Sequence, residues 1–409
     1  MNAPPAVCVY PDSKTPSAEV MKHSRTSEAK KAVIVLGMHR SGTSAVTAGL
    51  EAMGVSLGNK DVTIRYDNEK GYFENEDIVS FNDHLLKFLH SRWDNPFFDG
   101  RRAIEECPEG GLAPWYEEAD AIITENFSNH ATWAVKDPRM CQLLPFWTEV
   151  LERNGYSGEE TYYIHVLRSP LEVAHSQSRR HEKNPLLHYI GGDVRQTVLL
   201  WLSSHFQALR EVNSDNNMAV SFADLLEEPG REMTRIIDFL DIEVSRERIA
   251  GYVDTFLEKG LKHHNLDDRE NEELKKAYPE VVSLYDSLSA LSKEGPFDRS
   301  DIRNILGTVD PYAHALALFH PMYPLLSDAW YRWQEMREKH REVVTSYTWR
   351  MANNIRNRLI GVPGMKTIFG VVKRIYDFFS EKAADESGCL VIHMTCVGRP
   401  TDEHTSPDR

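Results

Sequence analysis

The sequence lacks the patterns that mark several common classes of protein. Its 409 residues contain no run of 18 or more apolar residues, so no membrane-spanning helix is predicted. The five cysteines form no C-x-x-C pair and the 17 histidines form no H-E-x-x-H pattern, so neither a zinc site nor a disulfide framework is predicted. Acidic residues outnumber basic ones, 62 to 47, and the resulting formal net charge of −15 argues against a general nucleic-acid-binding protein.

The N-terminal region also lacks the apolar core of a secretory signal. Together with the scarcity of cysteine, this leads us to expect a cytoplasmic protein. What the chain does contain is a globular composition, with 41% hydrophobic residues and a full set of aromatic ones. That length and composition are sufficient for one large domain or two smaller ones.

Composition and periodicity divide the chain into four parts. Residues 1–30 are polar, with several Pro and Ser residues, and are predicted to form a disordered arm. In residues 31–265, strand and helix patterns alternate, which predicts an α/β domain with a mostly parallel sheet flanked by helices. Residues 266–384 are predicted to be a helical extension, and 385–409 a disordered tail.

Short apolar or aromatic runs predict five strands in the α/β domain. They lie at residues 33–36, 71–74, 131–135, 162–167 and 218–222. Because the carboxyl ends of parallel strands meet at one edge of a sheet, the residues that follow these runs are the candidates for a shared site.

A glycine-rich turn follows the first of these strands. Residues 37–44 read G-M-H-R-S-G-T-S and separate the strand from an amphipathic helix pattern. This layout is typical of a phosphate-binding loop, in which backbone N–H groups and a helix N-terminus hold an anion. Nucleotide triphosphatases have Lys where this chain has Thr43, and the strong charge here is Arg40. The loop therefore predicts an anion site and argues against ATP hydrolysis, with a ligand-free turn as the alternative.

Cations also follow two later strands. Lys136 opens the motif K-D-P-R, and Arg168 lies eight residues before Ser176. A magnesium-dependent kinase usually has Asp at such a strand end, whereas Arg168 suits a second anionic group through its two-pronged guanidinium. The alternatives are a structural ion pair for Arg168 and a solvated side chain for Lys136.

Taken together, these motifs resemble those of the sulfotransferase superfamily. The resemblance covers residues 31–265 and rests on G-M-H-R-S-G-T-S, G-Y-F-E, W-A-V-K-D-P-R and V-L-R-S-P-L-E-V-A-H-S. It is nearest to the bacterial-type carbohydrate sulfotransferases. It implies a P-loop-like sulfotransferase fold and transfer of a sulfuryl group from 3′-phosphoadenylyl sulfate to a hydroxyl, without a metal.

The resemblance also implies where this donor binds. Arg168 and Ser176 would hold its 3′ phosphate, and Phe222 would stack on its adenine. The 5′ phosphosulfate would be held by the loop residues His39, Arg40, Ser41, Gly42, Thr43 and Ser44.

Three residues receive catalytic roles from the same resemblance. Arg40 would stabilise the leaving phosphate, Lys136 would contact the sulfuryl group, and Glu74 would be the general base. A carboxylate that complements the following helix dipole is the alternative for Glu74. Asp137 and Asp77 are the other candidates for the base. The segment Lys262-His263-His264 falls where relatives close a loop over the donor, with a surface position as the alternative.

The acceptor is only weakly encoded. Trp93-Asp94, with Tyr72 and Phe73, predicts an aromatic wall for a sugar ring, with core packing as the alternative. Residues 346–359 resemble a segment of bacterial surface-polysaccharide glycosyltransferases and favour a polysaccharide or glycolipid acceptor. The basic amphipathic segment 350–374 would either rest on the inner face of an anionic membrane or pack on the domain.

Two rival functions remain open at this stage. One is a P-loop nucleotide or small-molecule kinase, and the other is a non-catalytic anion-binding scaffold. The sequence gives no oligomeric state.

Overall fold

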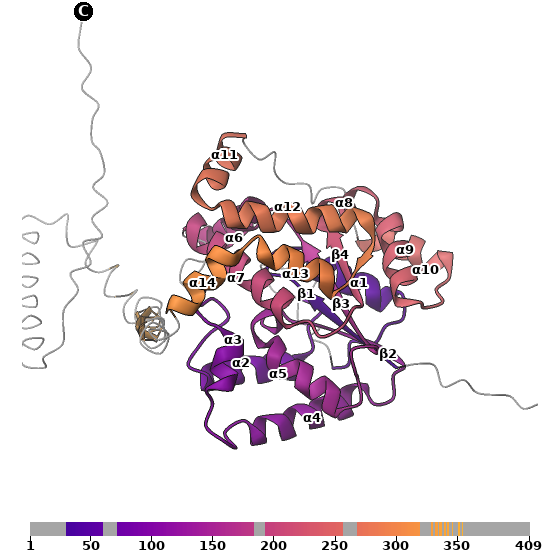
Figure 1. Cartoon of the computed structure of the whole chain (residues 1–409). Coiled ribbons are helices and arrows are strands. Elements are labelled where there is room, and N and C mark those ends of the chain that lie inside the picture. Colours follow the sequence, from indigo (N-terminus) through magenta and orange to yellow (C-terminus); the bar gives the residue numbers. More distant parts are fainter. Residues whose placement is uncertain are drawn as a thin grey trace, which may run out of the picture. The chain divides into compact units, whose positions relative to one another are not determined.

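The computed structural model describes most of the α/β region and little of the C-terminal region. The described residues are 30–59, 72–183, 193–256 and 268–319, with scattered positions between 329 and 354. They divide into two units, Met1–Glu335 and Met336–Arg409, and the first holds every strand and helix discussed below (Figure 1). The predicted arm, the tail, Lys262-His263-His264 and nearly all of segment 350–374 lie outside the described residues.

A five-stranded sheet runs through the first unit. The strands are β1 (Lys31–Leu36), β2 (Thr132–Lys136), β3 (Thr161–Leu167), β4 (Asn217–Ser221) and β5 (Pro296–Phe297). Their order is β2-β1-β3-β4-β5. The first four are parallel and β5 pairs antiparallel with β4. The predicted mostly parallel sheet is confirmed.

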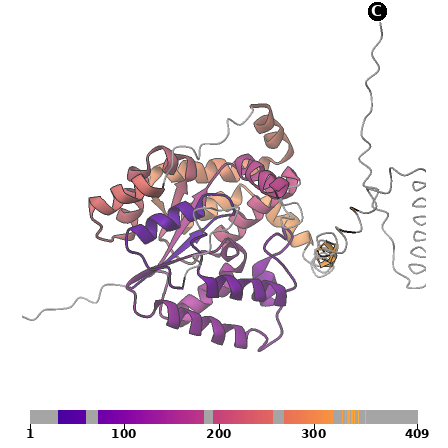
Figure 2. The ribbon, with the colours of Figure 1, turned by 180° about the vertical axis from the view of Figure 1, so that it is seen from behind.

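Helices cover both faces of this sheet (Figures 1 and 2). The side chains of β1 alternate, so that Ile34 belongs to the core on one face while Val33 and Val35 belong to the core on the other. Burial on both faces explains why the strand is continuously apolar rather than alternating with polar residues. One face packs against α1 (Thr43–Ala52), α8 (Phe222–Glu227), α9 (Pro229–Leu240) and α10 (Arg246–Phe256).

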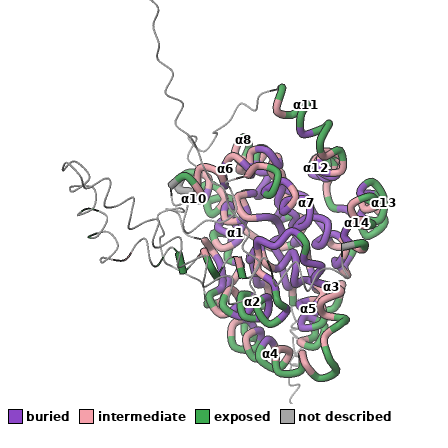
Figure 3. Tube along the Cα trace, turned by 90° about the vertical axis from the view of Figure 1, so that its left-hand side faces the viewer, coloured by how far each residue is buried: buried purple, intermediate pink, exposed green. Residues whose placement is uncertain are grey.

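The other face packs against a larger set of helices. They include α2 (Glu76–Phe88), α4 (Ala113–Phe127), α5 (Met140–Arg153), α6 (Pro170–Lys183), α7 (Val194–Glu211), α12 (Pro279–Glu294), α13 (Arg299–Gly307) and α14 (Asp310–Phe319). Helix α12 contributes Val281, Leu284 and Leu288 to this core. Helices α3 (Gly100–Glu105) and α11 (Asp268–Ala277) pack against the same core through Ile104 and Leu274, and the rest of α11 is mostly exposed (Figure 3). No helix among the described residues is both long and apolar enough to cross a membrane.

The predicted strand at residues 71–74 is wrong for the part of it that the structure describes. Tyr72, Phe73 and Glu74 form an irregular segment before α2, and Phe73 has a left-handed backbone with φ 54°. The Tyr72 carbonyl accepts hydrogen bonds from Lys136 Nζ at 3.2 Å and Ser44 Oγ at 3.2 Å. These contacts fix the segment over the glycine-rich turn instead of in the sheet.

The strand order has a consequence for the site. The chain leaves β1 for β2 on one side and returns to β3 on the other, so the order reverses beside β1. Ligands of open α/β sheets bind at the carboxyl ends of the strands where such a reversal occurs. The glycine-rich turn, Lys136, Arg168 and Phe222 all lie at this edge, because each ends or follows one of the parallel strands.

Two histidines are buried in the core on the α7 side. His165 in β3 and His205 in α7 are 0% and 1% exposed. Burial lowers the pKa of His165 to about 4, although a hydrogen bond with Asn217 opposes the shift. Burial, together with the charge that His165 carries when protonated, lowers the pKa of His205 to about 3. Both rings are therefore neutral in the folded protein at pH 7.

We expect these two rings to make the fold sensitive to acid. Above pH 6.5 both states keep the rings neutral, and the stability is fully present. As the pH falls from 6.5 to 4, the unfolded chain binds protons that the folded chain refuses. At about 1.4 kcal/mol per pH unit and group, the free energy of unfolding should fall by several kcal/mol. Urea denaturation at pH 7.5 and pH 5 measures this loss.

The His165→Gln/His205→Gln double variant should show a smaller loss between the two pH values than the wild type. The control is His84→Gln, at an exposed position of α2, which should behave as the wild type. An unchanged loss in the double variant would contradict the assignment.

Candidate active site

The glycine-rich turn has the backbone of a tight anion-binding loop. Arg40 adopts φ 73° and Gly42 adopts φ 96°, so two left-handed residues turn the chain from β1 into α1. Glycine is required at position 42 for a second reason: a Cβ there would lie 2.1 Å from Phe222 Cδ2. The turn is thus held against the first residue of α8.

Several donors of this turn are available for an anion. Gly42 caps α1 without a side-chain hydrogen bond, and the first turn of α1 contains no acidic residue. The positive end of the helix is therefore not neutralised within the helix. Ser41 is 0% exposed, and no residue that the structure describes hydrogen-bonds its Oγ. A buried hydroxyl of this kind and an open helix N-terminus fit a phosphate or sulfate group.

The residues predicted to hold the 3′ phosphate come together beside this turn. Arg40 Nε donates to Ser176 Oγ at 3.0 Å, and Arg168 Nη1 donates to the Arg40 carbonyl at 3.2 Å. Arg168 Nε also donates to Glu172 at 2.9 Å. Two guanidinium groups and one hydroxyl therefore share a small region at the start of α6. The role predicted for Arg40 at the leaving phosphate stays a prediction, because its side chain is here engaged with Ser176.

Phe222 packs against both this cluster and the turn. It is the first residue of α8 rather than the last of a strand, and it is 9% exposed. The Arg168 guanidinium lies over its ring at 5.1 Å from the centroid, and Gly42 contacts the ring edge. Stacking of Phe222 on adenine stays a prediction, while its contacts to Arg168 and Gly42 belong to the structure.

Glu74 and Lys136 form a buried ion pair. Lys136 is the last residue of β2, and its Nζ lies 2.6 Å from Glu74 Oε1. The side chains of Lys136 and Glu74 are 3% and 11% exposed. The sequence predicted both residues as catalytic, and the structure brings them together although 62 positions separate them. This pair fixes the position of the carboxylate, as a candidate general base requires.

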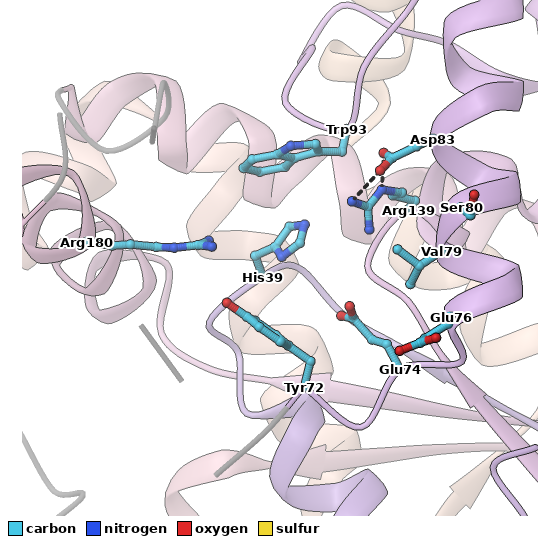
Figure 4. A pocket seen from close by; sticks show the side chains of 10 residues that line it. All are labelled: His39, Tyr72, Glu74, Glu76, Val79, Ser80, Asp83, Trp93, Arg139 and Arg180. Carbon is cyan, nitrogen blue, oxygen red and sulfur yellow. Dashed lines mark hydrogen bonds and ion pairs between the residues drawn. The ribbon is translucent and has the colours of Figure 1, made fainter. Parts of the chain in front are cut away.

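A cavity of about 360 Å³ opens next to this pair (Figure 4). This volume lies within the range of small-molecule sites. The wall is mixed, with the rings of Tyr, Trp and His, three carboxylates and two guanidinium groups. The lining residues are His39, Tyr72, Glu74, Glu76, Val79, Ser80, Asp83, Trp93, Arg139 and Arg180.

Arg139 is held in place by two carboxylates. Its Nε donates to Asp83 at 2.6 Å and its Nη1 to Asp137 at 2.9 Å. Asp137 in turn accepts from Asn82, whose own Oδ1 accepts from the indole of Trp147. Although burial disfavours the charged guanidinium, Asp137 and Asp83 hold its pKa above the ordinary value.

Sequence reasoning assigned Arg139 no role, and it missed Arg180 and Asp83. For Arg139 the signal was present, because the K-D-P-R motif places it two residues after Asp137. Arg180 and Asp83 lie in polar stretches of the α6 and α2 sequences, where no local pattern distinguishes them from charged residues that face solvent.

The other candidates for the base do not line the cavity. Asp137 is 0% exposed and is engaged by Asn82 and Arg139. Asp77 accepts hydrogen bonds from Asn59 and Asn126. Of the predicted candidates, Glu74 alone is among the cavity residues.

The predicted aromatic wall is present in part. Trp93 and Tyr72 line the cavity. Phe73 packs against the core on the α1 side, and Asp94 is buried beside Arg92, with 3.6 Å between their charged atoms.

Comparison with known proteins places the chain in a family. Among solved structures, it is similar to the sulfotransferase domain from the curacin biosynthetic pathway, with 17% identity, a TM-score of 0.32, and coverage of 54% of this chain and 76% of that one. It is also similar to sulfotransferase STF9 from Mycobacterium avium, with 14% identity, a TM-score of 0.35, and coverage of 61% of this chain and 76% of that one. For the sulfotransferase domain of the Synechococcus PCC 7002 olefin synthase, the identity is 17%, the TM-score is 0.31, and the match covers 73% of this chain and 96% of that one.

These TM-scores are too low to support an argument, and no curated protein matches the chain. The family is shown by the sequence instead. A family model described as "Sulfotransferase family" matches residues 32–246, which is 215 of the 409 residues. The matched range includes the glycine-rich turn, the Glu74–Lys136 pair and the Arg168–Ser176 cluster. The chain belongs to the sulfotransferase family.

Proposed function

We propose that this sulfotransferase uses 3′-phosphoadenylyl sulfate as the donor and a carbohydrate hydroxyl as the acceptor. The observation that carries the proposal is that two groups of hydrogen-bond donors suited to anions lie side by side at one edge of the sheet. The turn at residues 37–44 offers backbone N–H groups and the buried Ser41 hydroxyl. The second site, formed by Arg168 and Ser176, lies beside it. A donor with a 5′ phosphosulfate and a 3′ phosphate needs two such sites.

The Glu74–Lys136 pair supports the chemical step of this proposal. The acceptor oxygen bonds to sulfur while the bond between sulfur and the bridging phosphate oxygen breaks. The hydroxyl proton passes to Glu74, and the products are a sulfate ester and adenosine 3′,5′-bisphosphate. Negative charge grows on the equatorial sulfuryl oxygens and on the leaving phosphate, and Lys136 and the N–H groups of the turn stabilise it.

The cavity beside Glu74 supports a carbohydrate as the acceptor. Its aromatic walls, Trp93 and Tyr72, suit the C–H face of a sugar ring. Asp83 and Arg139 form an ion pair on the wall, so they offer acceptors and donors to hydroxyl groups without a large net charge. This combination favours a neutral polyol over a strongly charged acceptor.

Calorimetric titration of the full chain tests the donor. We expect adenosine 3′,5′-bisphosphate to bind in the absence of a divalent metal. Binding of ATP only, and only with Mg²⁺, would contradict the proposed donor and favour a kinase. Absence of binding by either nucleotide would favour a non-catalytic scaffold.

A further inference from the structure

His39 lies in the turn that follows β1, but its side chain faces the cavity rather than the donor cluster. Figure 4 shows its ring directed into the space framed by Trp93, Tyr72 and Glu74. The ring meets Trp93 edge to face, with 4.4 Å between the centroids. The next residue, Arg40, reaches Ser176 instead. Arg40 has a left-handed backbone, and the two neighbouring side chains point to different parts of the site.

The imidazole carries a buried nitrogen that lacks a hydrogen bond. Within the described residues, no group hydrogen-bonds His39 Nε2, and this atom is shielded from solvent. Leaving a buried polar atom unsatisfied costs about 1–3 kcal/mol. The cost disappears when a ligand in the cavity supplies the missing partner, as acceptor and donor groups of a polyol do.

The same ring is neutral at physiological pH. Burial comes first among the causes, and the positive charges of Arg139, Arg180, Lys136 and Arg40 add to it, so the pKa of His39 lies well below its ordinary value. A neutral imidazole has one N–H donor and one lone-pair acceptor. Such a ring is well suited to hydrogen-bond an uncharged group.

We propose that His39 is a specificity-determining residue of the acceptor subsite, where its Nε2 hydrogen-bonds a polar group of the sugar next to the reacting hydroxyl. This inference rests on the proposed function. It differs from the role in donor binding that the sequence predicted for His39. It requires the sugar to lie against Trp93, with the reacting hydroxyl toward Glu74.

Steady-state kinetics on two variants test this role. The assay uses 3′-phosphoadenylyl sulfate and a set of methyl glycosides of neutral hexoses, and mass spectrometry detects the sulfated glycoside. For the best glycoside, we expect His39→Ala to raise KM by about five- to tenfold, the value of one lost hydrogen bond, with a much smaller change in kcat. His39→Gln restores a side-chain amide near the position of Nε2 and should recover most of the loss. The Kd of adenosine 3′,5′-bisphosphate should stay within about twofold in both variants.

The matched control is His84→Ala, which removes an exposed imidazole from α2 next to the cavity residue Asp83. It should leave both KM and the bisphosphate Kd unchanged. Weaker bisphosphate binding by His39→Ala, with an unchanged KM for the glycoside, would place His39 in the donor subsite and overturn the inference. If the wild type binds the bisphosphate and sulfates none of the glycosides, the sugar acceptor and this role of His39 both fall, while the donor assignment stands.

Discussion

Glu74→Gln should lower kcat by about 10²-fold or more while the Kd of adenosine 3′,5′-bisphosphate stays nearly unchanged. The amide keeps the shape of the side chain and still accepts a hydrogen bond from Lys136 Nζ, which lies 2.6 Å from Glu74 Oε1. It is not able to take the proton of the acceptor hydroxyl, and general-base catalysis is worth about 10²–10⁴-fold. Initial rates at saturating donor, with calorimetric binding of the bisphosphate, measure the two quantities.

Two controls separate chemistry from folding in this experiment. Removing the carboxylate leaves Lys136 as a buried cation without its partner, so thermal unfolding has to show that the variant is folded at the assay temperature. Glu117→Gln, at an exposed position of α4, removes a carboxylate far along the chain from the cavity residues and should keep the wild-type rate. Full turnover by Glu74→Gln would assign the base to another residue.

Arg168→Ala should weaken bisphosphate binding by about 10- to 100-fold, which corresponds to about 1.5–3 kcal/mol for hydrogen bonds to a charged group. The guanidinium is already oriented by Glu172, the Arg40 carbonyl and the Phe222 ring, so little ordering is needed when the phosphate arrives. The chemical step should change less than the affinity, because Arg168 lies in the cluster with Ser176 and not at the Glu74–Lys136 pair.

A comparison of two nucleotides makes this test specific for the 3′ phosphate. The wild type should bind adenosine 3′,5′-bisphosphate far more tightly than adenosine 5′-phosphate, and Arg168→Ala should lose most of that difference. Arg153→Ala is the control, since Arg153 ends α5 and pairs with Asp120 on the surface. An equal loss of affinity for both nucleotides would show that Arg168 does not read the 3′ phosphate.

The sheet could be predicted from the sequence because its strands are buried on both faces. Continuous apolar runs such as Val33–Leu36 and Tyr162–Leu167 stand out from their surroundings, and β1 and β3 extend each of them by only one or two residues. The segment at 72–74 could not be predicted in this way. Its aromatic residues suggest a strand, but its path depends on hydrogen bonds from Ser44 and Lys136, residues remote from it in sequence.

The part of the site that follows directly after the strands could be predicted from the sequence. Residues that follow parallel strands must meet at one edge, which is why Arg40, Lys136 and Arg168 were identified. The direction of a side chain depends on backbone angles that no pattern encodes. One example is the turn itself, where Arg40 has a left-handed backbone and the neighbouring His39 side chain lines the cavity. Arg180 and Asp83 were missed because only the packing of α6 and α2 makes them cavity residues.

The short contact between Glu74 and Lys136 also bears on the timing of charge in the proposed reaction. Before transfer, the pair is neutral as a whole, so neither of these two largely buried side chains carries an unbalanced charge. When Glu74 takes the proton, Lys136 loses its counter-ion at the same moment as the departing phosphate gains negative charge. In the proposed reaction, the lysine then becomes the counter-ion of the sulfuryl oxygens and the leaving phosphate.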